Sequence, residues 1–272
     1  MFNVSESTPL TVVKKLAQQH SRPVFTICTV VSSTDEKEVV ITSSMDRQIV
    51  CWNTDSWKQL WRIQTLGGFV YCLDSSIMDP GTIALGIGDN TVRFWSSLTK
   101  ENSQTMATKT AAAVSSGISV DPFESSTIWK GLQSKVVSIA YHPSEPGTLG
   151  FGLDDGRVGL MSNLDGSIRA SPTSHKGSVY SVSWRRVVSA ARIEGEQQQS
   201  AAVAATLWSC GKDGVILQHD LSEGKRKAVN LDQLVVSAMK DKPDAQQTLM
   251  LFQIQHGVFA WNHDGSLLAV GN

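Results

Sequence analysis

The chain has 272 residues, of which 41% are hydrophobic and 18% charged, and its formal net charge at pH 7 is -1. This composition is typical of a globular protein long enough to bury a core. It excludes a disordered chain and leaves only a local basic patch as an electrostatic route to nucleic acid. No apolar run approaches the ~18 residues of a membrane span. The four cysteines form no CxxC pair, so buried, reduced thiols are expected.

Residues 1–19 show no clear pattern and form a separate N-terminal segment. From residue 20 onward, short apolar runs rich in Val, Ile, Phe and Tyr alternate with turn residues, which predicts β-strands. First strands of a repeating unit are expected at 24–30, 69–75, 136–142, 179–184 and 258–262. Second strands are expected at 38–44, 82–88, 148–154, 204–211 and 267–271. A fourth strand is clear only at 59–65.

A sequence motif recurs between the second and third strands: a tight polar turn with an aspartate, followed by an apolar stretch. The turn aspartates are Asp46, Asp89, Asp155 and Asp213. The third strand contains, in successive repeats, Trp52, Trp95, Leu160 and Gln218. The first two aspartates are separated by about 40–45 residues, the length of a WD-type propeller blade. Longer intervals follow because of insertions.

We therefore predict an all-β, WD40-type β-propeller that is partial, with about four and a half blades. The blades are placed near 20–66, 67–128, 129–175, 176–228 and 250–272, and the insertions at 97–126, 187–203 and 229–249. The chain stops where the fifth repeat should begin its third strand, so we expect a fragment of a longer protein.

The search for catalytic motifs is negative. The sequence contains no P-loop, GxSxG, HExxH or paired-cysteine metal motif, so we expect no enzyme, cofactor or metal. The pair Asp154-Asp155 is suggestive of a cation site. However, three other repeats carry an aspartate at the same place, which favours a turn aspartate that accepts backbone N–H bonds. His20, His175 and His256 each precede a first strand and are expected to tie a turn to that strand.

The starts of the first strands carry the candidate binding residues. Gly67 and Gly68 allow positive φ or close backbone approach, and Phe69 and Tyr71 are two residues apart, so they point to the same side of a strand. Other strand starts add Arg22, Lys135, Lys176 and Tyr180. Rings beside cations suit single-stranded RNA. Aromatic residues at strand starts also pack between blades, and spacing alone favours a protein-interaction platform over RNA binding.

Several phrases are more specific than a generic WD repeat, and through them the chain resembles the WD-repeat Gemin family of the survival-of-motor-neuron complex. These phrases lie at 20–22, 42–47, 51–52, 66–71, 86–89, 134–136, 151–160, 209–211, 216–219, 264–265 and 269–272. The resemblance covers roughly residues 20–272. It implies that the chain is the first part of the second of two adjoining seven-bladed propellers.

The resemblance implies a non-catalytic RNA-binding module. Its RNA is small nuclear RNA, read at the Sm site, with the methylguanosine cap as a further expected ligand. The implied RNA-binding residues are Arg22, which would donate a charge-assisted hydrogen bond, and Phe69 and Tyr71, which would stack on bases. The implied partners are other Gemin and survival-of-motor-neuron complex subunits, without a membrane, in the cytoplasm and the nucleus. The alternative is a protein-interaction scaffold without direct RNA contact.

Overall fold

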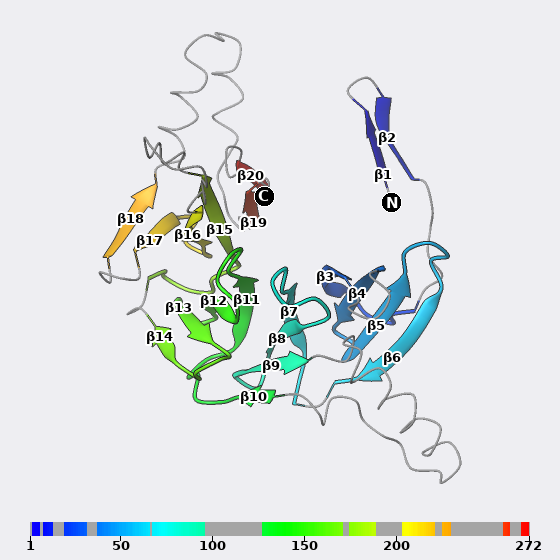
Figure 1. The fold of residues 1–272 in the computed structure, drawn as a ribbon, viewed down its shortest axis with the longest axis horizontal. Helices are drawn as coiled ribbons and strands as arrows, with labels where there is room; N and C mark the ends of the chain where they lie inside the picture. The colour runs from blue at the N-terminus through cyan, green and yellow to red at the C-terminus, as the bar shows by residue number, and fades with distance from the viewer. Residues whose placement is uncertain are drawn as a thin grey trace, which may run out of the picture.

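The computed structural model describes residues 2–5, 8–12, 19–31, 37–65, 67–95, 127–170, 174–188, 203–220, 225–229, 258–261 and 268–271. These residues form strands β1 to β20, and none of them is helical. Four antiparallel four-stranded sheets stand side by side in an open arc (Figure 1). The predicted all-β fold of repeated four-stranded blades is therefore confirmed. The insertion at 97–126, nearly all of that at 229–249, most of that at 187–203, and His256 lie outside the described residues.

Each blade is a meander of four strands in chain order. Blade 1 has β3 (Val24–Val31), β4 (Glu38–Ser44), β5 (Gln48–Asn53) and β6 (Gln59–Gln64). Blade 2 has β7 (Val70–Ser75), β8 (Ile83–Ile87), β9 (Thr91–Trp95) and β10 (Thr127–Trp129). Blade 3 has β11 (Val136–Tyr141), β12 (Thr148–Leu153), β13 (Val158–Ser162) and β14 (Ile168–Ala170). Blade 4 has β15 (Ser181–Val188), β16 (Val203–Cys210), β17 (Ile216–Asp220) and β18 (Lys225–Val229).

Two further hairpins lie at the ends of the arc. One pairs β1 (Phe2–Ser5) with β2 (Thr8–Val12), and the other pairs β19 (Val258–Trp261) with β20 (Leu268–Gly271). The inner strands β3, β7, β11, β15 and β19 contact one another in that order, and β6, β10, β14 and β18 lie at the periphery (Figure 1). The starts of the inner strands therefore lie along one rim of the arc.

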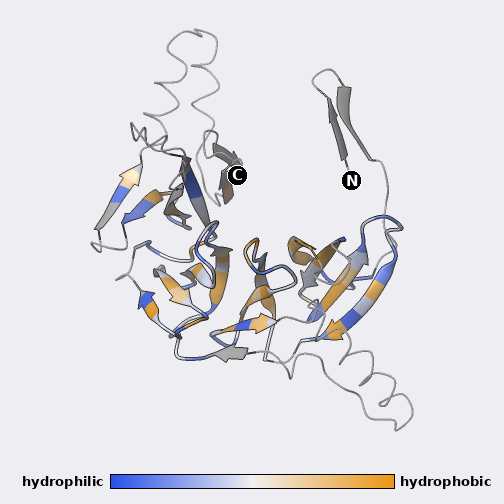
Figure 2. Ribbon diagram, in the orientation of Figure 1, coloured by the Kyte–Doolittle hydropathy of each residue, from blue (hydrophilic) through white to orange (hydrophobic). Residues whose placement is uncertain are grey.

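The hydrophobic core lies between blades. One buried cluster joins blades 1 and 2 and a second joins blades 2 and 3, with smaller clusters at the later junctions. In Figure 2 the apolar residues, coloured orange, lie largely on the strands of the blades. The second strand of each blade is buried on both faces, as in β8 from Ile83 to Ile87, so it reads as a continuous apolar run instead of an alternating one. All four cysteines are buried and free.

Small residues on the second strands let neighbouring blades approach closely. A Cβ atom on Gly86 of β8 would lie 2.8 Å from Cγ1 of Val136, which begins the inner strand of blade 3. A Cβ atom on Gly152 of β12 would lie 2.5 Å from Cγ1 of Val179 at the start of blade 4. Real carbon atoms do not pack at such distances. The missing side chains therefore make room for the valine of the next blade.

The turn aspartate of blade 1 anchors a chain of buried hydrogen bonds. His20 Nδ1 lies 3.1 Å from an Asp46 carboxylate oxygen, and His20 Nε2 lies 2.8 Å from Thr42 Oγ1. The Trp52 indole N–H donates to the same hydroxyl oxygen at 3.0 Å. Because the carboxylate only accepts, His20 donates from Nδ1 and accepts from the Thr42 hydroxyl at Nε2. The predicted role of His20 as a tie between turn and strand is confirmed.

Blade 4 repeats this chain with one substitution. His175 Nδ1 lies 2.9 Å from Asp213, and His175 Nε2 lies 2.7 Å from Ser209 Oγ. The donor that Trp52 supplies in blade 1 is here His219, whose Nε2 lies 2.6 Å from the Ser209 hydroxyl. An imidazole N–H thus takes the place of an indole N–H. The tie predicted for His175 is confirmed as well.

The register between second and third strands identifies equivalent residues on the third strands of the four blades. In each blade a third-strand residue six positions after the turn aspartate pairs with the second strand, as Trp95 pairs with Ile83 and Trp52 with Val40. By the same register that position is Met161 in blade 3 and His219 in blade 4, next to Leu160 and Gln218, which lie on the third strands as predicted. Leu160 and Gln218 are only half-buried and point to the other face, because a shift of one residue reverses the side of a strand.

The two anchoring aspartates are held in their ionised form. Burial opposes ionisation, but two backbone N–H groups and the histidine hydrogen-bond to each carboxylate and outweigh it. The pKa of Asp46 and that of Asp213 are therefore below their usual value. The turn aspartates accept backbone N–H bonds, as the sequence predicted.

Candidate nucleic-acid interface

The start of blade 2 is shaped by its two glycines. Gly67 and Gly68 have φ values of +89° and +131°, a region that residues with a side chain rarely adopt. A Cβ atom on Gly67 would overlap the carboxylate of Asp89. The Gly88 N–H donates to the carbonyl oxygen of Phe69 at 2.9 Å, which fixes the backbone where the ring leaves the chain. The glycines are therefore needed both for backbone conformation and for space.

β-Bulges at the starts of β3 and β7 each direct a side chain. The pairing of β3 with β4 shifts between Val24 and Thr26, and that of β7 with β8 shifts between Val70 and Cys72. The extra residue in the two bulges is Phe25 and Tyr71, respectively. A bulge changes the direction of the side chain it carries. Blades 1 and 2 therefore present an aromatic ring from equivalent positions.

Three rings meet at the junction of blades 1 and 2. Phe25 and Tyr71 have ring centroids 5.0 Å apart, and Phe69 lies 6.0 Å from Phe25 and 6.2 Å from Tyr71 in edge-to-face arrangements. We call Phe25, Phe69 and Tyr71 the aromatic cluster. Phe25 is 38% exposed, and the other two residues are half-buried. The cluster is packed internally, as aromatic pairs prefer, and still keeps surface open to solvent.

Arg47 brings a positive charge to the cluster. Its guanidinium carbon lies 5.4 Å from the centroid of the Phe69 ring, a cation–π distance. Arg47 sits in the turn between β4 and β5 with φ at +62°. The equivalent turn positions in the other blades are Asn90, Gly156 and Gly214, which also have positive φ. A bulky side chain at this strained position suggests a use outside the turn itself.

Arg22 lies close to this turn but does not contact the rings. Its carbonyl oxygen accepts a hydrogen bond of 2.9 Å from the Ser44 hydroxyl, and the carbonyl of Pro23 accepts from the N–H of Met45. The residue is exposed, and within the described part of the chain its guanidinium makes no hydrogen bond or ion pair. The structure therefore brings Phe69 and Tyr71 into contact and places Arg22 beside the turn that carries Arg47.

One hydrogen bond crosses the junction beneath the cluster. The hydroxyl of Ser43, on β4, donates to the carbonyl oxygen of Val70 on β7 at 2.8 Å. Val70 stands between Phe69 and Tyr71 in the chain, so the bond holds the backbone of blade 2 directly under the two rings. Ser43 occupies on blade 1 the position that Gly86 occupies on blade 2, opposite the residue after the bulge.

The other basic residues of the strand starts belong to blades 3 and 4. Lys135 Nζ is 4.0 Å from an Asp154 oxygen, and both side chains are largely exposed. Lys176 is exposed, and its backbone N–H donates to Asp213. An exposed pair at this distance is worth about 0–1 kcal/mol, so Lys135 can exchange its partner for another anion at little cost.

The acidic side chains near the turns of blade 3 are engaged by neighbouring residues. Among the described residues, no three His, Cys, Asp or Glu side chains are grouped to hold a metal ion. Asp155 is engaged by Arg157 through an ion pair of 2.8 Å, and Asp154 by Ser178. In the part of the chain that the structure describes, no helix has the length and apolar character needed to cross a membrane.

Sequence reasoning missed Phe25 and Arg47. Both could have been found by aligning the repeats. Phe25 follows Val24 as Tyr71 follows Val70, and Arg47 stands where other repeats carry a turn-forming Asn or Gly. For Phe25 the signal is an aromatic residue at the same position in two repeats, and for Arg47 it is a residue that differs from the other repeats. A search for motifs along the chain detects neither.

The chain is similar to curated proteins over nearly its whole length. Gem-associated protein 5 of Homo sapiens is 31% identical over 256 residues, which are 94% of this chain and 15% of that protein. Gem-associated protein 5 of Mus musculus is 32% identical over 254 residues, 93% of this chain and 15% of that protein. Component of gems protein 5 of Dictyostelium discoideum is 40% identical over 150 residues, 54% of this chain and 10% of that protein. The chain thus spans about 15% of the length of the first two relatives.

Solved structures agree on the fold. The WD40 repeats of RRP9 superimpose with a TM-score of 0.52 at 14% identity, covering 79% of this chain and 53% of that one. The structure of U3-55K gives a TM-score of 0.52 at 15% identity, covering 79% of this chain and 54% of that one. The chain matches no protein-family model. The WD40-type propeller fold is therefore confirmed, and so is the resemblance to the WD-repeat Gemins.

Proposed function

We propose that this chain, a set of WD40-type blades similar to a segment of Gem-associated protein 5, is part of a non-catalytic module that binds single-stranded RNA. The observation that carries the proposal is the aromatic cluster at the junction of blades 1 and 2, with the guanidinium of Arg47 5.4 Å from the Phe69 ring. The coarser conclusion, a WD-repeat module of the Gemin type, rests on the sequence and fold comparisons.

The proposed mechanism is stacking on a preformed surface. Bases that stack on aromatic side chains gain about 1–3 kcal/mol each, whatever their identity. The rings already lie against each other, so few rotamers are lost on binding. Arg47 sits beside Phe69, and Arg22 has no partner among the described residues. Both can therefore meet phosphate groups of an RNA whose bases contact the cluster.

The RNA we propose is small nuclear RNA, read at its uridine-rich Sm site during assembly of spliceosomal particles. The methylguanosine cap is a second proposed ligand. The proposed protein partners are other Gemins and subunits of the survival-of-motor-neuron complex, in the cytoplasm and the nucleus. What supports this assignment is the similarity to Gem-associated protein 5 together with exposed rings at positions that suit unpaired bases.

The test is the affinity of the full-length protein for a uridine-rich single-stranded RNA that contains an Sm site. Replacing Phe69 and Tyr71 together by Ala should weaken binding by more than about tenfold, since tenfold corresponds to about 1.4 kcal/mol. Replacing both by Leu keeps the apolar volume and removes the flat faces, so it should weaken binding similarly if stacking is the cause. Leu164→Ala, at an exposed turn of blade 3, is the control.

The same experiment decides against the alternative function. If both double variants keep the thermal stability of the parent protein and its RNA affinity, the rings do not stack on RNA. The rim would then serve as a scaffold for a protein subunit, which is the function that strand-start aromatics otherwise favour.

A further inference from the structure

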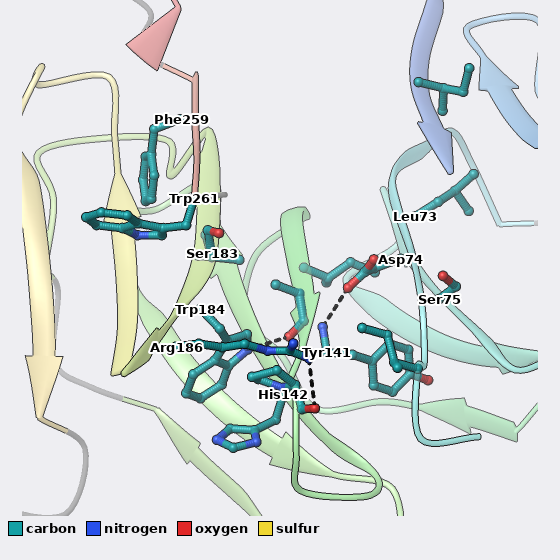
Figure 3. A pocket seen from close by; sticks show the side chains of 16 residues that line it. Leu73, Asp74, Ser75, Tyr141, His142, Ser183, Trp184, Arg186, Phe259 and Trp261 are labelled. Carbon is teal, nitrogen blue, oxygen red and sulfur yellow. Dashed lines mark hydrogen bonds between the residues drawn. The ribbon is translucent and has the colours of Figure 1, made fainter. Parts of the chain in front are cut away.

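A cavity of about 680 Å³ opens at the end of the inner strands opposite to the aromatic cluster. Every residue that lines it comes from β3, β7, β11, β15 or β19, or from the turn that follows one of them. Asp74 lines the cavity (Figure 3), and Tyr71 of the aromatic cluster lies nearer the start of the same strand, β7. Three residues of strand span about 10 Å, so a ligand in the cavity is separate from one on the cluster.

Asp74 is the notable polar group in this cavity. One carboxylate oxygen accepts a hydrogen bond of 2.6 Å from the Tyr141 N–H, as the dashed line in Figure 3 shows. The carboxylate makes no ion pair with any residue that the structure describes. It lies deep enough that desolvation raises the pKa of Asp74 to about 6, so it is mostly ionised at neutral pH. The backbone N–H groups of Tyr141 and Ser75 hydrogen-bond to this half-buried carboxylate, but no described cation neutralises its charge, so it can attract a basic group.

The walls of the cavity suit the stem and head of a basic side chain. Tyr141, Trp184 and Trp261 are among the residues that line it (Figure 3). The indole N–H of Trp184 donates to the carbonyl oxygen of Ala140 at 2.9 Å, which fixes that ring. Aromatic faces attract cations, and the methylene stem of Lys or Arg packs on apolar surface while the charged head reaches a polar group.

The mouth of the cavity is apolar and open to solvent. Ile27, on β3, is 67% exposed, and Ile77, in the turn after β7, is 70% exposed. Both residues also line the cavity. Large aliphatic side chains this exposed on either side of a cavity are suited to the apolar residues that flank a basic one in a peptide.

We propose that this cavity binds a lysine or arginine side chain presented by an apolar segment of a partner protein, with Asp74 as its counter-ion. The site is independent of the RNA-binding surface and gives the module a second, protein-directed face. An RNA ligand fits less well, because its phosphates would approach the Asp74 carboxylate.

Arg186 defines the orientation of the bound segment. Its guanidinium donates to the carbonyl oxygen of Pro143 at 3.2 Å and lines the wall formed by β11 and β15. His142, on the same wall, has a pKa lowered by burial, while Glu145 acts in the opposite sense. It therefore adds no charge at neutral pH. A basic side chain would lie toward Asp74, with the carbonyl oxygens of the peptide toward Arg186.

The test uses the full-length protein and two fluorescein-labelled peptides, Ala-Ile-Arg-Ile-Ala and the same peptide with the neutral isostere citrulline in place of arginine. Fluorescence anisotropy should show binding of the arginine peptide at least tenfold tighter than that of the citrulline peptide. Asp74→Asn, which keeps an acceptor for the Tyr141 N–H, should remove this difference. Glu145→Gln removes a charge from the exposed surface near the cavity and should leave the difference intact.

Two further measurements keep the outcome clear. Ile77→Ala changes only an exposed residue and should weaken both peptides alike. Saturating uridine-rich RNA should not displace the arginine peptide. The proposal is overturned if the two peptides bind equally, if the difference survives in Asp74→Asn, or if RNA competes with the peptide. Loss of RNA binding in the Phe69 and Tyr71 variants has no bearing on these results, so the two proposals fail separately.

Discussion

The guanidinium carbon of Arg47 lies 5.4 Å from the centre of the Phe69 ring, and the two residues belong to different blades. Arg47 reaches the ring from a turn in which its backbone has φ at +62°. The carbonyl oxygen of Arg47 accepts hydrogen bonds from the N–H and the hydroxyl of Thr65, at 2.7 and 2.9 Å, which hold that backbone in place. A strained residue thus links the turn of blade 1 to the aromatic surface of blade 2.

Arg47→Gly should separate stability from binding. Glycine adopts this φ without strain but is more flexible in the unfolded chain, so the free energy of unfolding should stay within about 1 kcal/mol of the parent. RNA affinity should fall by about three- to tenfold, because a cation beside the ring and the phosphates is lost. Filter binding and thermal denaturation would check both. Asn90→Gly, at the same position in blade 2, is the control and should leave RNA binding unchanged.

Phe25→Leu tests the third member of the cluster. Leucine keeps most of the apolar volume, so stability should change by less than about 1.5 kcal/mol. RNA binding should weaken by about fivefold or more, since one stacking face is lost. Fluorescence titration with a uridine-rich RNA would measure this. Ile27→Ala, at an exposed residue of β3 that lines the cavity, should have no effect on RNA; an equal loss in both variants would contradict a role of Phe25 in stacking.

Thr42→Val removes the hydroxyl that joins His20 to Trp52 while nearly keeping the shape of the side chain. His20 Nε2 and Trp52 Nε1 then each lose a hydrogen-bond partner, which should lower the free energy of unfolding by about 1–3 kcal/mol. Thr42→Ser keeps the hydroxyl and should cost much less. Urea denaturation of the three proteins would show the order. A Val variant as stable as the Ser variant would mean that the hydrogen-bond chain does not stabilise the blade.

Asp74→Asn should change the pH dependence of stability in a defined direction. Burial raises the pKa of Asp74 to about 6, so between about pH 4 and pH 6 the folded state binds more protons than the unfolded state. The contribution of Asp74 to stability therefore falls as pH rises through this window. The variant should be more stable than the parent by roughly 1–2 kcal/mol at pH 7.5, and this advantage should disappear near pH 4.

The comparison with the parent protein is essential in that measurement. Asp46 and Asp213 have lowered pKa values, and their stabilising contribution is lost as the pH falls below about 4. Because both proteins carry these groups, the difference in unfolding free energy between parent and variant isolates Asp74. A difference that does not vary with pH would show that Asp74 has an ordinary pKa in the folded state.

A strand could be predicted from the sequence where its buried residues alternate with exposed ones or follow one another without interruption, because either arrangement leaves a pattern of apolar residues. β4, from Glu38 to Ser44, and the other second strands are buried on both faces, and their predicted limits agree closely with the structure. The peripheral strands β10 and β14 have three residues each and carry little pattern, so they were not predicted. The third strands contain Leu160 and Gln218 as predicted, but which of their residues are equivalent to Trp52 and Trp95 depends on cross-strand pairing, which the sequence does not display.

The candidate site was only partly predictable for a related reason. Phe69 and Tyr71 are close in sequence, and a double glycine precedes them, so local reasoning was sufficient. Phe25 and Arg47 join them through the packing of one blade on the next, which brings together residues that are distant along the chain. Asp74 was not predicted either, since an aspartate in a strand is unremarkable until its burial is known.

The hydrogen bond from Ser43 to the Val70 carbonyl crosses the junction of blades 1 and 2, so the aromatic cluster lies across the boundary between two sheets. Phe25 belongs to the sheet of blade 1, and Phe69 and Tyr71 belong to blade 2. The distances between the rings therefore depend on how the two sheets pack against each other. A change that tilts the sheets by a small angle, even far below the surface, would alter the gap offered to a nucleobase. If the cluster binds RNA as proposed, substitutions that change side-chain size along the junction should alter base selectivity as much as substitutions of the rings.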